Sequence, residues 1–283
     1  MDHQPTDCQD FSYVKREVLL KLDKIYLTLG GNLILRDVSA EIRNIERTSF
    51  KNQGQVICFL GPSGIGKSQT ARIIAGLQKP TSGTVTLKDG TITGPGKVCM
   101  VPQNNTLFDY MTVAQNLQIA GKMGGLSKGE INEKATGYIE LFGLREHLAK
   151  YPRDLSGGTK QRVAIVRQLM CATNYMVMDE PFSGLDPIMK ARAQEAIVKL
   201  SQLDEYNTVI IVTHDVTEGL TVSDTCWMMG YDKDAVGNNI LGARIVAHLD
   251  LADLGFAWRP DLERDPKFLQ FVREVKDKFR NLK

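Results

Sequence analysis

The segment GPSGIGKS (61–68) combines glycines with a lysine and a serine in a spacing that suits the binding of phosphate groups. Glycines let the backbone approach a phosphate closely and turn its N–H groups toward it. In this pattern Lys67 reaches the β- and γ-phosphates, and the hydroxyl of Ser68 binds Mg²⁺. The residues expected to line the phosphate site are Gly61, Pro62, Ser63, Gly64, Ile65, Gly66, Lys67, Ser68 and Gln69. The apolar run VICFL (56–60) before them predicts a buried strand, which a glycine loop formed by chance would lack.

Two adjacent acids end the segment MVMDE (176–180), which predicts a second short buried strand. A carboxylate at the end of such a strand is well placed to bind Mg²⁺, and we assign that role to Asp179. Glu180 follows where the chain turns, so its carboxylate is free to point toward the γ-phosphate and polarise a water molecule. A pair of acids in an exposed loop is the alternative interpretation.

The segment LSGGTKQR (155–162) is typical of a helix start, with Ser156 as the N-cap. A cap alone does not require the two glycines that follow, Gly157 and Gly158. Free N–H groups, a hydroxyl and the helix dipole together favour a second contact with an anion. Gln103 after KVCMVP and His214 after VIIVT each end a predicted strand, and neither is specific by itself.

Strands and helices alternate along the chain, which predicts an α/β fold with a largely parallel sheet. Short segments between Val18 and Ile42 alternate as strands do, after a polar extension at residues 1–17. The polar stretch Arg43–Gln53 predicts a loop or hairpin tip. Helices are predicted at 69–77, 112–123, 127–144, 156–171 and 189–203, and from Asp265 to the C-terminus. The apolar positions of the last helix are expected to pack on the protein's own core.

The composition excludes several classes of protein. The 283 residues carry a net charge of only +2, from 35 basic and 33 acidic residues, so binding to nucleic acid is not expected. None of the five cysteines forms a CxxC pair, and Cys58 and Cys99 lie in apolar stretches, which favours buried thiols in a reducing compartment. The sequence contains no signal peptide and no apolar run of membrane-spanning length, so we expect a cytoplasmic protein.

Taken together, the motifs and their order resemble those of the nucleotide-binding subunit of ABC transporters, over roughly residues 18–250. The motifs are GPSGIGKS, the VPQ that contains Gln103, LSGG at 155–158, MVMDE, SGLD (183–186) and VTHD (212–215). The resemblance implies a P-loop NTPase (RecA-like) core with an antiparallel β subdomain and an inserted α-helical subdomain at about 104–170. Residues 251–283 would form a C-terminal helical extension.

The resemblance also implies the roles of individual residues. ATP and Mg²⁺ would be the cofactors, with Ser68, Gln103 and Asp179 serving the metal. Glu180 would be the general base and His214 would contact the γ-phosphate. In such proteins the LSGG segment and Asp186 act across a dimer of two subunits, so Ser156, Gly157 and Gly158 would close on the ATP of a second copy or a related subunit. Two positions depart from the family pattern: Leu29 replaces an aromatic residue that stacks on adenine, and Gln69 replaces a Thr or Ser near the α-phosphate.

The expected partners are membrane permease subunits and a solute-binding protein, and the chain would lie on the inner face of the cell membrane through the permease. Phe108 and Tyr110 are candidate permease contacts, with core packing as the alternative. The segment 259–275 resembles the C-terminal end of the nitrate/sulfonate/taurine importer group, which favours an importer of a small solute. A lipid or efflux system, or a soluble ABC ATPase acting on DNA or ribosomes, is the alternative.

Overall fold

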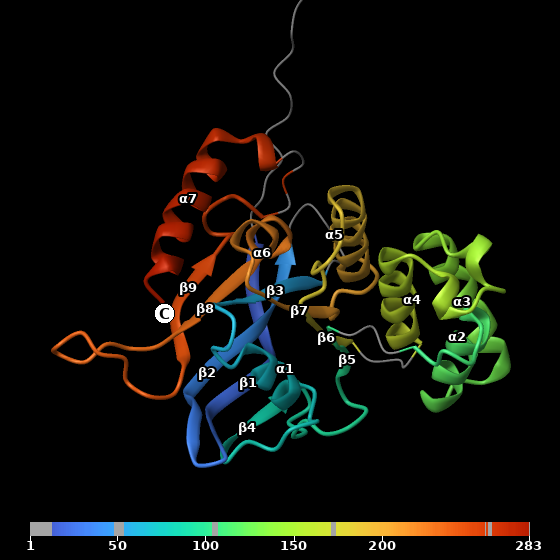
Figure 1. The fold of residues 1–283 in the computed structure, drawn as a ribbon. Helices are drawn as coiled ribbons and strands as arrows, with labels where there is room; N and C mark the ends of the chain where they lie inside the picture. The colour runs from blue at the N-terminus through green and yellow to red at the C-terminus, as the bar shows by residue number, and fades with distance from the viewer. Residues whose placement is uncertain are drawn as a thin grey trace, which may run out of the picture.

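The computed structural model describes residues 13–47, 54–103, 107–170, 174–257, 259 and 262–282. Its centre is a six-stranded sheet in the order β5-β6-β7-β3-β8-β9 (Figure 1). The strands are β3 (Gln55–Leu60), β5 (Cys99–Val101), β6 (Tyr175–Asp179), β7 (Thr208–Thr213), β8 (Thr225–Gly230) and β9 (Arg244–Asp250). All neighbours are parallel except β8 and β9, so the predicted largely parallel α/β core is confirmed. Cys58 and Cys99 are buried in it, as expected.

A second sheet is antiparallel and contains β1 (Tyr13–Leu29), β2 (Asn32–Arg47) and β4 (Ser82–Leu87), in the order β2-β1-β4. Two boundaries expected from the sequence are wrong here. Residues 13–17 belong to β1 rather than to a polar extension, and residues 43–47 belong to β2 rather than to a loop. These strand ends pair with each other, and most of their side chains are polar, although Ile45 is buried and Tyr13 packs against the core. Residues 1–12 and 48–53 lie outside the described part.

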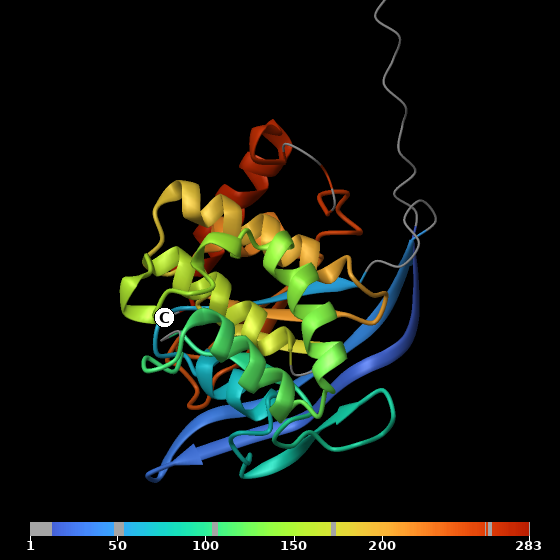
Figure 2. The same cartoon turned by 90° about the vertical axis from the view of Figure 1, so that its right-hand side faces the viewer.

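Helix α1 (Lys67–Ile74) follows β3 and leads to β4, whereas α5 (Pro187–Ser201) connects β6 to β7 and α6 (Val216–Val222) connects β7 to β8. Helix α1 ends three residues earlier than predicted, because Gly76 takes a left-handed conformation with φ of 70°. Helices α2 (Val113–Met123), α3 (Lys128–Leu141) and α4 (Gly157–Leu169) gather on one side of the molecule, as Figures 1 and 2 show. Capping boxes begin α2 and α3, at Thr112 and Ser127.

The C-terminal helix α7 (Pro266–Arg280) begins at Asp265, whose carboxylate accepts hydrogen bonds from the backbone N–H groups of Lys267 and Phe268. Its apolar side, with Phe268 and Val272, is buried in the core, and the helix contacts α6. Packing on the protein's own core is therefore confirmed for this helix. Across the described ranges, no helix combines the length and apolar character needed to span a bilayer.

Candidate active site

The phosphate-binding segment connects the end of β3 to the start of α1, as its motif requires. Gly66 has φ of 102°, and a Cβ atom there would come within 2.7 Å of the Leu35 side chain, so only glycine fits. The ammonium group of Lys67 is buried and donates hydrogen bonds to the carbonyl oxygens of Gly61 at 2.8 Å and Pro62 at 3.1 Å. Burial lowers the pKa of Lys67, against the opposing effect of Glu180 and Asp179.

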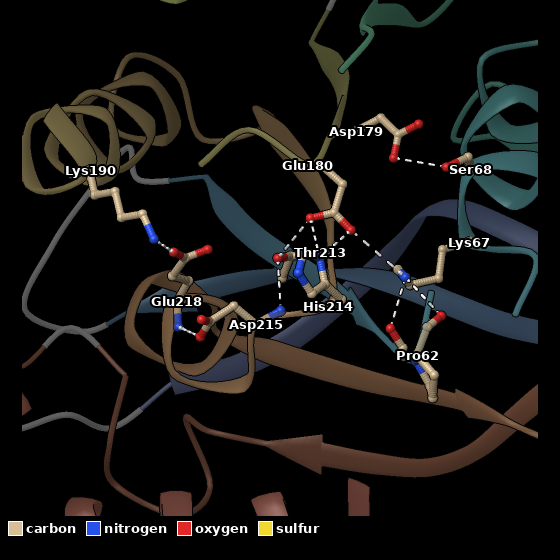
Figure 3. Close-up of polar contacts among 11 residues, drawn as sticks. Pro62, Lys67, Ser68, Asp179, Glu180, Lys190, Thr213, His214, Asp215 and Glu218 are labelled. Carbon is tan, nitrogen blue, oxygen red and sulfur yellow. Dashed lines mark hydrogen bonds and ion pairs between the residues drawn. The ribbon is translucent and has the colours of Figure 1, made fainter. Parts of the chain in front are cut away.

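Ser68 and Asp179 meet although they are far apart in the sequence. The Ser68 hydroxyl donates a hydrogen bond of 3.1 Å to Oδ1 of Asp179, which ends β6 (Figure 3). Burial raises the pKa of Asp179, and the hydrogen bond from Ser68 opposes that shift. A hydroxyl and a carboxylate oxygen side by side are the hard ligands that Mg²⁺ prefers. Among the described residues, no group of three or more His, Cys, Asp and Glu side chains is arranged to hold a metal ion.

Glu180 does not lie in an exposed loop, because only 12% of its side chain is accessible. Its backbone is left-handed with φ of 50°, an unfavourable conformation for a residue with a Cβ atom, and its N–H donates to the carbonyl oxygen of Val212 at 2.8 Å. Both carboxylate oxygens lie 2.9 Å from Nδ1 of His214, and Oε1 lies 3.8 Å from the Lys67 ammonium (Figure 3). The turn after β6 therefore directs this carboxylate to the phosphate-binding segment.

Two further residues of this network were not identified as site residues from the sequence. The Thr213 hydroxyl donates to Oε2 of Glu180 at 3.3 Å and accepts a hydrogen bond from the N–H of Asp215 at 3.1 Å. Asp215 caps α6 by accepting from the N–H of Glu218, and the Glu218 carboxylate pairs with Lys190 of α5 at 2.5 Å (Figure 3). Thr213 and Asp215 stand on either side of His214 in the motif VTHD, which was the available signal.

The LSGG segment is not part of this cluster. Ser156 caps α4 by accepting a hydrogen bond from the N–H of Thr159 at 3.3 Å, and Gly157 and Gly158 form the first turn. In Figure 1, α4 lies with α2 and α3, away from α1. The carboxylate of Asp186 caps α5 by accepting hydrogen bonds of 3.0 Å from the N–H groups of Ile188 and Met189. The single chain thus separates the LSGG segment from its own phosphate-binding segment.

Three further candidate residues are Gln103, Leu29 and Gln69. Gln103 is exposed, two residues after the end of β5. Leu29 is the last residue of β1, and its side chain is 37% exposed. The Oε1 atom of Gln69 is buried and has no hydrogen-bond partner among the described residues. This side chain therefore has unused hydrogen-bonding capacity next to Ser68.

Comparisons with known proteins agree with this geometry. The family model described as ABC transporter matches residues 46–183. The nitrate import ATP-binding protein NrtD of Synechocystis is 36% identical over 210 residues, which cover 74% of this chain and 75% of that protein. The bicarbonate transport ATP-binding protein CmpC of Synechococcus elongatus is 37% identical over 213 residues, but these span only 31% of its length.

Solved structures share the fold. CbiO1 of Clostridium perfringens, part of the ABC transporter complex CbiONQ, aligns with a TM-score of 0.69 at 20% identity, covering 92% of this chain and all of that one. A dimeric ATP-binding cassette bound to ADP and phosphate, MJ0796, aligns with a TM-score of 0.66 at 24% identity, covering 82% of this chain and 99% of that one. Fold, motifs and sequence identity lead to one conclusion: the chain belongs to the family of ABC transporter ATP-binding proteins.

Proposed function

We propose that this chain is the ATP-hydrolysing subunit of an ABC importer. The observation that carries the proposal is the position of Glu180, held by His214 and Thr213 within 3.8 Å of the phosphate-binding Lys67. A buried carboxylate at this place is a base for water that attacks the γ-phosphate. The related nitrate and bicarbonate proteins favour import as the direction of transport. The resemblance of the segment 259–275 favours a small solute of the nitrate, sulfonate or taurine class.

The hydrolysis step follows from the positions of these side chains. Lys67 exchanges its contacts with the Gly61 and Pro62 carbonyls for phosphate oxygens, and the backbone N–H groups of the segment surround the phosphates. Glu180 accepts a proton from water, whose oxygen bonds to the γ-phosphorus while the bond to the ADP oxygen breaks. His214 donates a hydrogen bond to the γ-phosphate. Ser68 and Asp179, with Gln103, would hold Mg²⁺, which supplies positive charge for the phosphoryl group and the leaving oxygen.

A second subunit would complete each site, because this chain keeps its LSGG segment apart from its own phosphate-binding segment. Ser156, Gly157 and Gly158 would donate to the γ-phosphate on the other copy, and Asp186 would connect the two sites. We infer a homodimer or a pair with a related ATPase subunit, with no role for nucleic acid. This dimer would bind membrane permease subunits at the cytoplasmic face of the membrane, and a solute-binding protein would deliver the solute.

Tyr110 supports the permease interface. Its side chain is 73% exposed, and its ring lies 5.8 Å from that of Phe108, which stacks under the Arg167 guanidinium at 4.5 Å. Core packing does not account for Tyr110, although Phe108 is half-buried. An exposed aromatic residue next to a second aromatic ring is a suitable anchor for a protein partner.

Replacing Ser156 with arginine tests the composite site. We expect ATP hydrolysis to fall at least about 100-fold, because a bulky cation at the start of α4 blocks the approach of the second copy. ATP affinity of the monomer should change less than threefold, since Ser156 makes no contact with the chain's own phosphate-binding segment. The rate of ATP hydrolysis per protein molecule, measured over a range of protein concentrations, checks the first expectation. Nucleotide titration checks the second. Ser156→Thr keeps the cap and is the control; equal rates for Ser156→Arg and wild type would contradict the shared site.

Replacing Leu29 with tyrosine tests how the adenine base of ATP is bound at the same site. Leu29 occupies the position of the usual aromatic residue, and a ring there would stack on adenine. We expect ATP affinity to rise by about fivefold, which corresponds to ~1 kcal/mol. Leu29→Met, which adds no ring, is the control. An unchanged ATP affinity in Leu29→Tyr, measured by calorimetric titration, would show that no room for stacking exists beside β1.

A further inference from the structure

A cavity of about 470 Å³ lies where helix α5 of the core faces the C-terminal end of helix α3. Its walls come from the end of α3, the short helical turn Arg145–His147, Arg162 of α4 and one side of α5 with Arg192. Helix α4 contacts both α3 and α5 and stands between them in Figure 1. The volume is within the range of small-molecule sites, and no residue of the phosphate-binding segment lines the cavity.

Arg162 attaches the end of α3 to α4 and keeps a donor in reserve. Its Nη1 donates hydrogen bonds to the carbonyl oxygens of Phe142 at 2.5 Å and Gly143 at 3.4 Å, and its Nη2 donates to the Thr159 hydroxyl at 3.3 Å. These bonds cap α3, whose last turn contains no basic residue. The Nε–H group of Arg162 is buried and has no acceptor in the described part of the chain. The guanidinium therefore retains hydrogen-bonding capacity for a ligand.

Arg192 lines the same cavity from α5. Its guanidinium forms no ion pair with any of the described residues. Burial lowers the pKa of Arg162, and the positive charge of Arg192 lowers it further. The two guanidinium groups are thus close enough to repel each other, and an anion between them would relieve that repulsion.

Three carboxylates also line the cavity, and neighbouring cations neutralise two of them. Glu140 pairs with Arg145, and Glu195 pairs with Lys199 at 2.6 Å. Glu146 is exposed and forms no ion pair within the described ranges. One free negative charge therefore faces two arginines that have no carboxylate partner.

The environment of His147 shows which sign of charge dominates beside this cavity. Burial lowers the pKa of His147, and the cations Lys150 and Arg162 lower it further, against the opposing effect of Glu146. Positive charge thus outweighs the Glu146 carboxylate at this wall. A cavity with this balance favours an anionic ligand.

We propose that this cavity binds a phosphate dianion between Arg162 and Arg192, either as free phosphate or as the phosphate group of a small organic molecule. A guanidinium presents paired N–H donors that match two phosphate oxygens, and such charge-assisted hydrogen bonds are strong. Because Arg162 belongs to α4 and Arg192 to α5, the bound phosphate would connect the group of helices α2–α4 to the core. This site is separate from the proposed ATP site and does not depend on ATP hydrolysis.

The test is calorimetric titration with inorganic phosphate in a Lys67→Met background, which weakens binding at the segment 61–68. Adding Arg192→Gln should lower phosphate affinity about tenfold, because it removes charge-assisted hydrogen bonds. Adding Glu146→Gln should raise the affinity about twofold, because it removes the free negative charge. Arg273→Gln is the matched control, since Arg273 is exposed on α7 and its loss changes the net charge equally. Arg192 is exposed too, so Arg192→Gln should keep the melting temperature of its background.

Three results would overturn the inference. Unchanged phosphate affinity after Arg192→Gln would exclude a contact with Arg192. Equal losses for Arg192→Gln and Arg273→Gln would show a general effect of net charge. A Lys67→Met protein that binds no phosphate would assign all phosphate binding to the segment 61–68.

Glycerol 3-phosphate distinguishes the two sources of the phosphate group. Binding tighter than that of inorganic phosphate, and lost with Arg192→Gln, would identify a small organic phosphate as the ligand. Equal or weaker binding would identify the free ion.

Discussion

Glu180→Gln should bind ATP with near-normal affinity and hydrolyse it at least about 100-fold more slowly than the wild type. Glutamine fills the same volume and still accepts the hydrogen bond from Thr213, but its amide accepts no proton from the attacking water. General-base catalysis contributes roughly 10²–10⁴-fold to enzymatic rates, which sets the expected loss. Single-turnover hydrolysis and calorimetric ATP titration measure the two quantities separately.

A neighbouring carboxylate provides the control for this variant. Glu218 pairs with Lys190 and reaches the site only through Asp215. Glu218→Gln removes a charge of the same sign and should leave hydrolysis within about threefold of the wild type. If Glu180→Gln kept more than a third of wild-type turnover, Glu180 would not be the base, and another group would have to accept the proton.

Lys67→Met should weaken ATP binding by at least about 30-fold. Methionine has a similar length and fits the buried position, so the substitution removes the charge and its hydrogen bonds while largely keeping the volume. Charge-assisted hydrogen bonds contribute about 1.5–3 kcal/mol each, which matches a loss of this size. Burial already lowers the pKa of Lys67, so its ammonium is poorly solvated and should gain strongly from phosphate oxygens.

Lys190→Met is the matched control for Lys67→Met. Lys190 is also paired with a glutamate, but it lies on α5 and does not contact the phosphate-binding segment. The ATP affinity of the Lys190→Met variant should stay within twofold of that of the wild type in calorimetric titration. An affinity for Lys67→Met within threefold of the wild type would contradict phosphate binding by Lys67.

Local sequence patterns predicted the parts of the site whose geometry is local. The glycine spacing around Lys67 specifies a loop between strand and helix, and the structure places Ser68 at the first turn of α1. The nearness of Ser68 and Asp179 is also consistent with the sequence patterns, since both residues follow or end parallel strands, β3 and β6, whose carboxyl ends lie at one edge of the sheet on either side of β7. The left-handed backbone of Glu180 did not follow, because tertiary contacts such as its hydrogen bond to Val212 maintain that conformation.

Features that depend on distant pairing were beyond the sequence patterns. The ends of β1 and β2 near Tyr13 and Arg47 carry mostly polar side chains, and only their mutual pairing makes them strands. The hairpin at 232–240 is equally polar, and its attachment depends on Arg36, nearly two hundred residues away.

Whether ATP hydrolysis by this chain serves a membrane transporter is best measured by co-purification. Tagged Glu180→Gln protein, isolated with ATP and Mg²⁺ from detergent-solubilised membranes of cells that naturally contain it, should bring down a protein with several membrane-spanning segments. Tyr110→Ala in the same background should reduce the yield of that protein, because its exposed ring is the proposed anchor. Recovery of only soluble proteins, ribosomes or nucleic acid would contradict the transporter function and leave an ATPase with a different purpose.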